Sequence, residues 1–302
     1  MKTLISICFL LIWSGELFLC GQDHEWWNRK HDWDGCTSWS RYLIVSPSYM
    51  GPNALPVPEV HKGKPSGTLT LEAGAEGHYS KGDRTGNLFA GFYTPLFSPR
   101  AGLGLRYVPL ELYRTDTLTR DLRRSREYDA RGISFGDLYA GTFIHLVRED
   151  GRIPDIMLSL HLKTASGTRF EAARHTDAPG YYVDLSAGKS IRREGRMLNL
   201  TRVYGMIGFY AFQTNLEKYM QNDAVLYGAG IELTAGRWQI DHQLGGYAGY
   251  LDNGDRPLVY RLDLRWDTPS AADLKIRFQH GLNDFPYTSL RVSGLFHFLQ
   301  IK

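Results

Sequence analysis

The strongest constraint on the fold is a period-two alternation of apolar and polar residues that begins at Gly67 and continues almost to the last residue. The run "LVYRLDLRWD", residues 258–267, is a clear case. Because successive side chains of a strand point to opposite faces, such a run predicts a strand with one apolar and one wet face. About twelve such runs can be distinguished, at residues 67–79, 86–97, 101–114, 136–148, 155–166, 180–190, 196–212, 223–235, 237–250, 258–268, 273–281 and 287–300.

The connections between these runs alternate in length. Those after odd-numbered runs are the longer, as in "RTDTLTRDLRRSREYDARGISF" and "GTRFEAARHTDAPG", whereas "SPRA", "RREG" and "AG" follow even-numbered runs. Long outer loops and short periplasmic turns are typical of outer-membrane barrels, whose closed sheet leaves no unpaired edge in lipid. We therefore predict an all-β, antiparallel transmembrane β-barrel of about 12 strands. The alternative is a large secreted β-sandwich, for which connections of more equal length are expected.

The N-terminus predicts export. Lys2 precedes a short apolar run, and we expect a signal peptide at residues 1–21 that is cleaved after Gly21. Lipidation of Cys20 in "LFLC" is the alternative, although Leu19 is bulky for that motif. No later stretch is long and apolar enough for a transmembrane helix.

An irregular arm is expected at residues 22–66, ahead of a barrel domain at 67–302. The arm holds Trp26, Trp27, Trp33 and Trp39, followed by prolines that forbid a long helix or a central strand. So many tryptophans need a surface to pack on, such as a barrel mouth, a lumen or a membrane interface.

The combination of a signal peptide, alternating strands, unequal loops and the aromatic-rich final run "TSLRVSGLFHFLQIK" resembles the Gram-negative outer-membrane β-barrels. The segment "LHLKTASG" is similar to the meta-pathway phenol-degradation group of outer-membrane channels, over about thirty residues around it. These resemblances imply a location in the outer membrane. Barrels of this class commonly end on an aromatic residue, whereas here Phe298 is followed by "LQIK".

The alternation register predicts which charged side chains face the lumen. They include more basic than acidic residues, which favours anionic solutes, and they could either line a solute path or pair across strands and plug the barrel. The predicted lumen residues are Glu72, Glu76, Arg106, Lys163, Glu232, Asp241, Arg261, Asp263, Arg265, Lys275, Arg277 and Arg291.

The loop between the fifth and sixth runs is a candidate gate. Thr168-x-x-Glu171 fits a capping box and predicts a helix of about two turns that ends before Pro179. We assign Thr168, Arg169, Glu171 and Arg174 to this gate. Ser166, His175 and Asp177 are minority candidates for a catalytic triad, although no "GxSxG" elbow is present.

Partners and cofactors follow from charge and spacing. The net charge of +3, with bases and acids interleaved, argues against nucleic acid. The arginines of residues 114–135 could bind anionic outer-membrane lipid, but a solvated loop that neutralises its own charges is the favoured interpretation. The arm could bind a periplasmic or surface protein. No cofactor is expected, and no metal site, because His24, His31, Asp32, Asp34 and Cys36 match no metal-binding spacing. After cleavage at Gly21, Cys36 is free or pairs with a second chain, and it could pair with Cys20 if that residue is retained without lipid.

The sequence thus favours an outer-membrane barrel that passively transports or binds a small polar or anionic solute. A surface lipid or ester hydrolase and a plugged structural or assembly barrel are the alternatives. An open lumen would favour transport, and a filled lumen would favour a scaffold or an enzyme.

Overall fold

The computed structural model describes residues 24–192, 198–268 and 272–300. The chain forms two compact units, residues 1–37 and residues 38–302. The expected signal peptide, its cleavage site and Cys20 lie outside the described residues. Within the described ranges, no helix is long and apolar enough to cross a membrane.

The described part of the first unit is a short helix followed by a tight turn. Helix α2 (Glu25–Lys30) buries Trp27. After it, the Asp34 carboxylate accepts hydrogen bonds from the backbone N–H groups of Cys36 and Thr37 at 2.9 and 2.7 Å. The carboxylate thus satisfies the donors of the turn, and these hydrogen bonds lower the pKa of Asp34.

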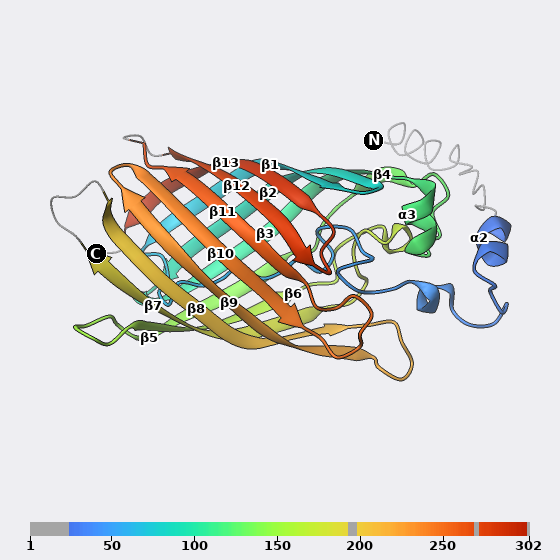
Figure 1. The fold of residues 1–302 in the computed structure, drawn as a ribbon, viewed down its shortest axis with the longest axis horizontal. Coiled ribbons are helices and arrows are strands. Elements are labelled where there is room, and N and C mark those ends of the chain that lie inside the picture. Colours follow the sequence, from blue (N-terminus) through green and yellow to red (C-terminus); the bar gives the residue numbers. More distant parts are fainter. Residues whose placement is uncertain (1–23, 193–197, 269–271, 301–302) are drawn as a thin grey trace, which may run out of the picture. The chain divides into compact units, whose positions relative to one another are not determined.

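The second unit is a closed antiparallel barrel of 12 strands with one additional short strand, β4, paired to β3 (Figure 1). The ring closes because β1 pairs with both β2 and β13. The strands are β1 (Thr68–Ser80), β2 (Asp83–Leu96), β3 (Ser98–Thr115), β4 (Arg131–Ser134), β5 (Tyr139–Val147), β6 (Asp155–Lys163), β7 (Gly180–Arg192), β8 (Leu198–Gln213), β9 (Gln221–Ala235), β10 (Trp238–Ala248), β11 (Leu258–Trp266), β12 (Ala272–Asn283) and β13 (Thr288–Gln300). The predicted fold class is therefore confirmed.

Side chains alternate around the barrel wall as the sequence pattern requires. Leu71, Ile207 and Leu290 are exposed on the outer surface, whereas Arg261 and Asp263 of β11 are buried on the inner side. The inner charges also pair across strands, since Asp263 lies directly opposite Arg277 of β12. An apolar exterior and a polar interior are what a strand wall needs in a bilayer.

Connections of unequal length lie at the two ends of the barrel. One end, the long-loop end, carries residues 116–138, 164–179, 214–220 and 249–257 between strands. Helices α3 (Thr117–Leu122) and η2 (Phe170–Ala172) belong to the first two of these loops. The other, short-turn end includes the single residue Phe97 and the turn 236–237. The hairpin of β1 and β2 departs from the expected alternation, because its turn is only Lys81–Gly82 although it lies at the long-loop end.

Gly82 explains how this hairpin can be so tight. Its φ of +89° is in the left-handed region, and a Cβ atom would lie 2.0 Å from the Thr119 hydroxyl. Only glycine fits where the turn meets the start of α3. The short turn therefore also anchors the longest loop of the barrel.

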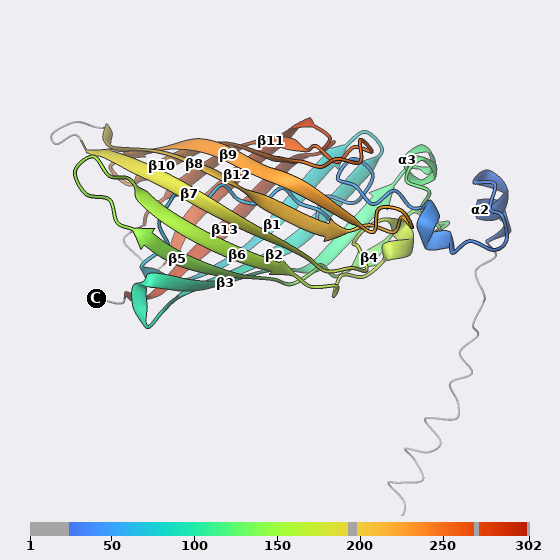
Figure 2. The same cartoon turned by 90° about the horizontal axis from the view of Figure 1, so that it is seen from below.

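The irregular segment before β1 lies inside the barrel. We call residues 43–64 the plug (Figure 2). It begins at the long-loop end, where the Gly51 N–H donates to the Ala173 carbonyl at 2.8 Å. It ends at the short-turn end, where Arg202 of β8 donates to the Lys62 carbonyl at 2.7 Å. The turn η1 (Trp39–Tyr42) precedes it.

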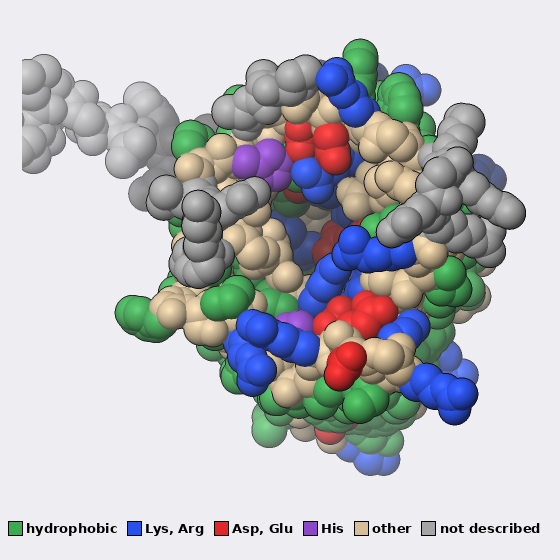
Figure 3. Space-filling view, turned by 90° about the vertical axis from the view of Figure 1, so that its left-hand side faces the viewer, with side chains coloured by type: hydrophobic (Ala, Val, Ile, Leu, Met, Phe, Trp, Pro, Cys, Tyr) green, Lys and Arg blue, Asp and Glu red, His purple; other side chains and the backbone are tan. Residues whose placement is uncertain are grey.

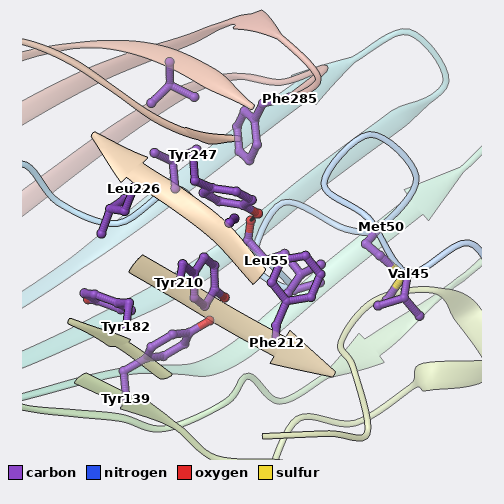
Figure 4. Close-up of a cluster of buried hydrophobic side chains, with 14 of the residues drawn as sticks. Val45, Met50, Leu55, Tyr139, Tyr182, Tyr210, Phe212, Leu226, Tyr247 and Phe285 are labelled. Atoms are coloured by element: carbon purple, nitrogen blue, oxygen red, sulfur yellow. Dashed lines mark hydrogen bonds between the residues drawn. The ribbon is translucent and has the colours of Figure 1, made fainter. Parts of the chain in front are cut away.

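Apolar residues of the plug form the core together with aromatic side chains of the wall. Val45, Met50 and Leu55 pack with buried rings that include Tyr210 and Tyr247 (Figure 4). The Tyr247 hydroxyl also donates to the Leu55 carbonyl at 3.2 Å. A 12-stranded barrel is wider than the eight-stranded barrels whose interior side chains just fill, and in this chain the plug occupies part of that interior.

The predicted two-turn helix after Thr168 is wrong. Only the single 3-10 turn η2 forms, because Arg169 and Ala173 on either side of it adopt left-handed conformations with φ of 65° and 54°. The Thr168 hydroxyl does not cap this turn and instead accepts from the Phe135 N–H at 3.0 Å. Contact with the neighbouring loop thus replaces the local capping box.

Candidate functional site in the barrel lumen

Most of the predicted lumen charges form ion pairs within the wall. Arg291 contacts Glu76 at 3.0 Å and Lys275 contacts Glu72 at 3.4 Å. Other wall pairs are Arg277 with Asp263 at 2.6 Å and Arg265 with Asp273 at 2.7 Å. Lys163 of β6 pairs with Asp137 of the loop before β5 at 2.8 Å. The inner surface is thus a ladder of cross-strand pairs, as one of the two alternatives from the sequence requires.

Other predicted lumen residues hold the plug. Arg261 donates to the carbonyls of Pro58 and Val57 at 2.9 and 2.5 Å. Lys62 of the plug contacts Glu232 of β9 and, at 2.7 Å, Asp241 of β10. Charges of the wall therefore fix both the backbone and the side chains of the plug.

Glu59 of the plug forms an ion pair with Arg277 of the wall. It accepts two hydrogen bonds from the Arg277 guanidinium, one of them at 2.9 Å. Arg277 simultaneously donates to Asp263 through two nitrogen atoms, at 2.6 and 2.7 Å. Such bidentate, charge-assisted contacts are strong and geometrically specific.

The plug does not fill the lumen completely. A cavity of about 280 Å³ remains between the plug and strands β1, β2, β3, β5, β6, β7, β12 and β13. Viewed onto the short-turn end, the molecule shows a hollow surrounded by basic, acidic and histidine side chains (Figure 3). The volume is close to the lower end of the roughly 300–1,000 Å³ of small-molecule sites.

The cavity combines aromatic walls with an excess of positive charge. Its aromatic lining comprises Phe89, Phe92, Tyr93, Tyr139, Phe143 and Tyr182. Its charged lining comprises the bases Arg106, Lys275, Arg277 and Arg291 against the acids Glu59 and Glu72. Such a surface suits a small anion that has an apolar or ring-shaped part.

Arg106 differs from the other bases of the cavity. Its guanidinium lies 4.4 Å from the centre of the Tyr139 ring. Among the described residues, no carboxylate forms an ion pair with it, whereas Lys275, Arg277 and Arg291 each have one. Arg106 is therefore the cationic group available to an anionic ligand.

The candidate gate loop is fixed at the long-loop end. Arg174 is fully buried and donates to Glu111 at 2.9 Å and to Asp83 at 2.7 Å. These carboxylates raise the pKa of Arg174 against the opposing effect of burial. Thr168 and Arg169 are exposed and Glu171 is half-buried. Of the four assigned residues, only Arg174 reaches into the barrel.

The three catalytic candidates are not joined by hydrogen bonds, although all three are among the described residues. Ser166 is exposed and shares a hydrogen bond of 2.8 Å with Thr164. Asp177 is exposed as well. His175 is completely buried, 3.8 Å from Glu111 and 4.0 Å from Asp137, and burial lowers its pKa. This arrangement offers no hydroxyl that His175 could activate.

Sequence reasoning missed the plug residues Glu59, His61 and Lys62. The alternation that identified the wall is absent from the plug. One available signal was the run from Tyr42 to Pro58, which contains no charged residue and is broken by prolines. An uncharged, non-helical run is what an extended chain needs in order to lie buried inside a barrel.

Comparisons with known proteins support the fold. No protein-family model and no curated protein matches the sequence. Among solved structures, the COG4313 outer membrane channel from Pseudomonas putida F1 is similar, with a TM-score of 0.52 and 12% identity, covering 84% of this chain and all of the channel chain (100%). The KdgM porin in complex with disordered oligogalacturonate has a TM-score of 0.47 and 10% identity, covering 76% of this chain and 99% of the porin chain.

These findings define the class. The chain has the fold of the Gram-negative outer-membrane β-barrels, in its 12-stranded form. In this chain, the plug occupies part of the lumen.

Proposed function

We propose that the protein is a channel of the Gram-negative outer membrane that is closed by its own plug and admits a small anionic solute. Residues 1–21 act as the signal peptide for export, residues 22–66 form the arm, and residues 67–302 form the barrel. Support for the membrane location comes from the apolar outer surface of the strands. The long loops then face outward and the short turns face the periplasm.

The observation that carries the proposal is the cavity beside the plug. A scaffold would need only a filled lumen, yet here an aromatic space of about 280 Å³ remains, with Arg106 lacking an ion-pair partner among the described residues. Arg106 is half-buried and its guanidinium has several N–H donors that a solute or water can bind. A small carboxylate with an apolar or ring-shaped part would fit both the charge and the walls.

The resemblance of "LHLKTASG" to the phenol-degradation group concerns the same place. These residues, 160–167, end β6 and begin the following loop, and they include His161 of the cavity wall. A ring-shaped organic acid as the solute is consistent with that resemblance, and this solute class stays a prediction.

Ion selectivity in planar bilayers tests the proposal. The purified full chain is inserted in a salt gradient, and the reversal potential is measured. We expect single-channel openings that select for anions, because four bases and two acids line the cavity. Correctly folded protein that shows no openings under any condition would instead favour the plugged structural barrel, and cation-selective openings would contradict the assigned solute class.

A further inference from the structure

Three side chains capable of binding a metal ion meet where the plug contacts the wall. They are His61 of the plug, His161 of β6 and Asp184 of β7, and one ligand atom from each lies within 4.8 Å of the others. Asp184 and His161 lie on paired strands, opposite Ser159 and Tyr182 respectively. The strand register therefore places both on the inner face, next to the plug.

His161 has a nitrogen atom with no assigned role. Its side chain is 8% exposed, and its Nε2 atom has no hydrogen-bond partner among the described residues. The ring stacks on Tyr182 at 4.3 Å between centroids and on His61 at 5.1 Å. Opposite it in the register is Gly141, where a Cβ atom would lie 2.3 Å from Nδ1. The wall is thus shaped around an imidazole whose other nitrogen is unsatisfied, which is unfavourable without a ligand.

His61 is oriented in the manner of a metal ligand. Its Nδ1 atom lies 2.9 Å from the Asp184 carboxylate and 3.0 Å from the Ser159 hydroxyl. An Asp184 oxygen that holds Nδ1 fixes the ring and leaves Nε2 of His61 for a metal ion, while the second carboxylate oxygen can bind the same ion. Both histidines line the cavity, so an ion could reach them from the lumen.

We propose that His61, His161 and Asp184 bind a divalent transition-metal ion of the Zn²⁺, Cu²⁺ or Ni²⁺ type and that this ion fastens the plug to the wall. Imidazole nitrogen favours these ions over Mg²⁺ and Ca²⁺, which prefer all-oxygen sites. Two ligand atoms on a tetrahedral zinc ion are roughly 3.4 Å apart. The three ligand atoms lie within 4.8 Å of one another, so small side-chain movements bring them to this separation. The binding itself does not depend on the proposed channel function, although its effect on conduction does.

Calorimetric titration of residues 22–302, which lack the proposed signal peptide with Cys8 and Cys20, in detergent with ZnCl₂ at neutral pH tests the site. A Cys36→Ser background removes the exposed thiol as a competing ligand. We expect one Zn²⁺ per chain at this site. His161→Phe keeps a ring between Tyr182 and His61 but removes the ligand, and it should weaken binding by at least about tenfold. Asp184→Asn should weaken binding as well.

His280→Ala is the matched control, because His280 is an exposed histidine of β12 whose Nδ1 lies 2.8 Å from the Thr288 hydroxyl. Its zinc affinity should equal that of the background protein. Heat-modifiable migration on gels verifies that each variant is folded. A background protein that does not bind zinc, or a folded His161→Phe variant that binds it with unchanged affinity, would overturn the proposal. Both readouts are independent of conductance, so the failure of the channel function would be seen separately.

Discussion

Glu59 of the plug and Arg277 of β12 form a bidentate ion pair inside the barrel, although they are 218 positions apart in the sequence. Arg277 also holds Asp263 of the neighbouring strand at 2.6 Å. A single guanidinium therefore connects the plug to the ladder of charges in the wall. In a channel closed by its own N-terminal segment, this pair is a principal contact that must break before the plug can move.

Replacing Glu59 by Gln should loosen the plug. The Arg277 side chain is buried but the Glu59 side chain is 33% exposed, so we expect the loss of about 1.5–3 kcal/mol that is typical of a hydrogen bond to a charged group. About 1.4 kcal/mol corresponds to a tenfold shift in an equilibrium. We expect a large rise in the fraction of time that the channel is open, measured as single-channel openings in planar bilayers. Asp252→Asn, at a largely exposed loop carboxylate, is the control and should leave the openings unchanged. Equal opening in Glu59→Gln and in the unmodified protein would show that the pair does not hold the plug.

Arg106 should determine the affinity for anionic solutes. Arg106→Gln removes the one cavity base without an ion pair among the described residues. Because the solute then has no charge-assisted hydrogen bond to this base, its binding should weaken about tenfold or more. Block of the chloride current by small aromatic carboxylates measures this affinity. Arg84→Gln, at an exposed position of β2, should bind as tightly as the unmodified protein. Unchanged block in Arg106→Gln would remove Arg106 from the solute site.

Arg174 should be needed for a stable barrel. Arg174→Gln leaves the buried Glu111 without a guanidinium partner, while Asp83 keeps only its ion pair with Arg123 at 2.6 Å. We expect this loss to destabilise the fold by about 3 kcal/mol. Urea unfolding in detergent, followed by tryptophan fluorescence, measures the change. Arg169→Gln, on the exposed part of the same loop, should alter stability by less than about 1 kcal/mol. Equal unfolding midpoints for the two variants would contradict the assigned role of Arg174.

His175 should make the long-loop end sensitive to acid. Burial lowers its pKa below 6.5, so the folded protein binds a proton at His175 less readily than the unfolded chain does. Its contribution to stability is therefore complete above pH 6.5 and is lost as the pH falls toward the lowered pKa. Between pH 7.5 and 5.5, the urea midpoint should fall less in His175→Gln than in the unmodified protein. Parallel pH profiles would mean that His175 does not titrate in this range.

The wall of the barrel could be predicted from the sequence, but its contents could not. Runs such as 258–268 alternate with a two-residue period, so the sequence of each strand shows which of its side chains face inward. Each strand of this kind also pairs with its neighbours in the chain. Contacts such as Glu59 with Arg277 link distant segments, and the plug has no periodicity to signal them. The same holds for His61, His161 and Asp184, which only the closed barrel brings together.

In the loop at residues 164–179, a local sequence signal predicted a helix that does not form. Thr168 and Glu171 satisfy a local helix-capping rule. However, the Thr168 hydroxyl accepts a hydrogen bond from the Phe135 N–H, and the left-handed conformation of Arg169 prevents a longer helix. The preference for a short capped helix is small, so a contact with the neighbouring loop outweighs it. Arg174 was assigned to the gate from its position in the loop alone, and its buried carboxylate partners on β2 and β3 could not be foreseen.

If the channel is closed by its own plug, the plug must move for solute to pass. A disulfide between Val60→Cys and Gly228→Cys, which would tie the plug to β9, tests this most directly. A Cβ atom at Gly228 would lie 2.7 Å from Cγ2 of Val60, close to the separation of a Cβ atom and the opposite sulfur in a disulfide. With Cys36→Ser as background, we predict that the oxidised protein shows no openings in planar bilayers and that a reductant restores them, while neither single-cysteine variant responds. Openings of equal size and frequency in the oxidised and the reduced protein would contradict the claim.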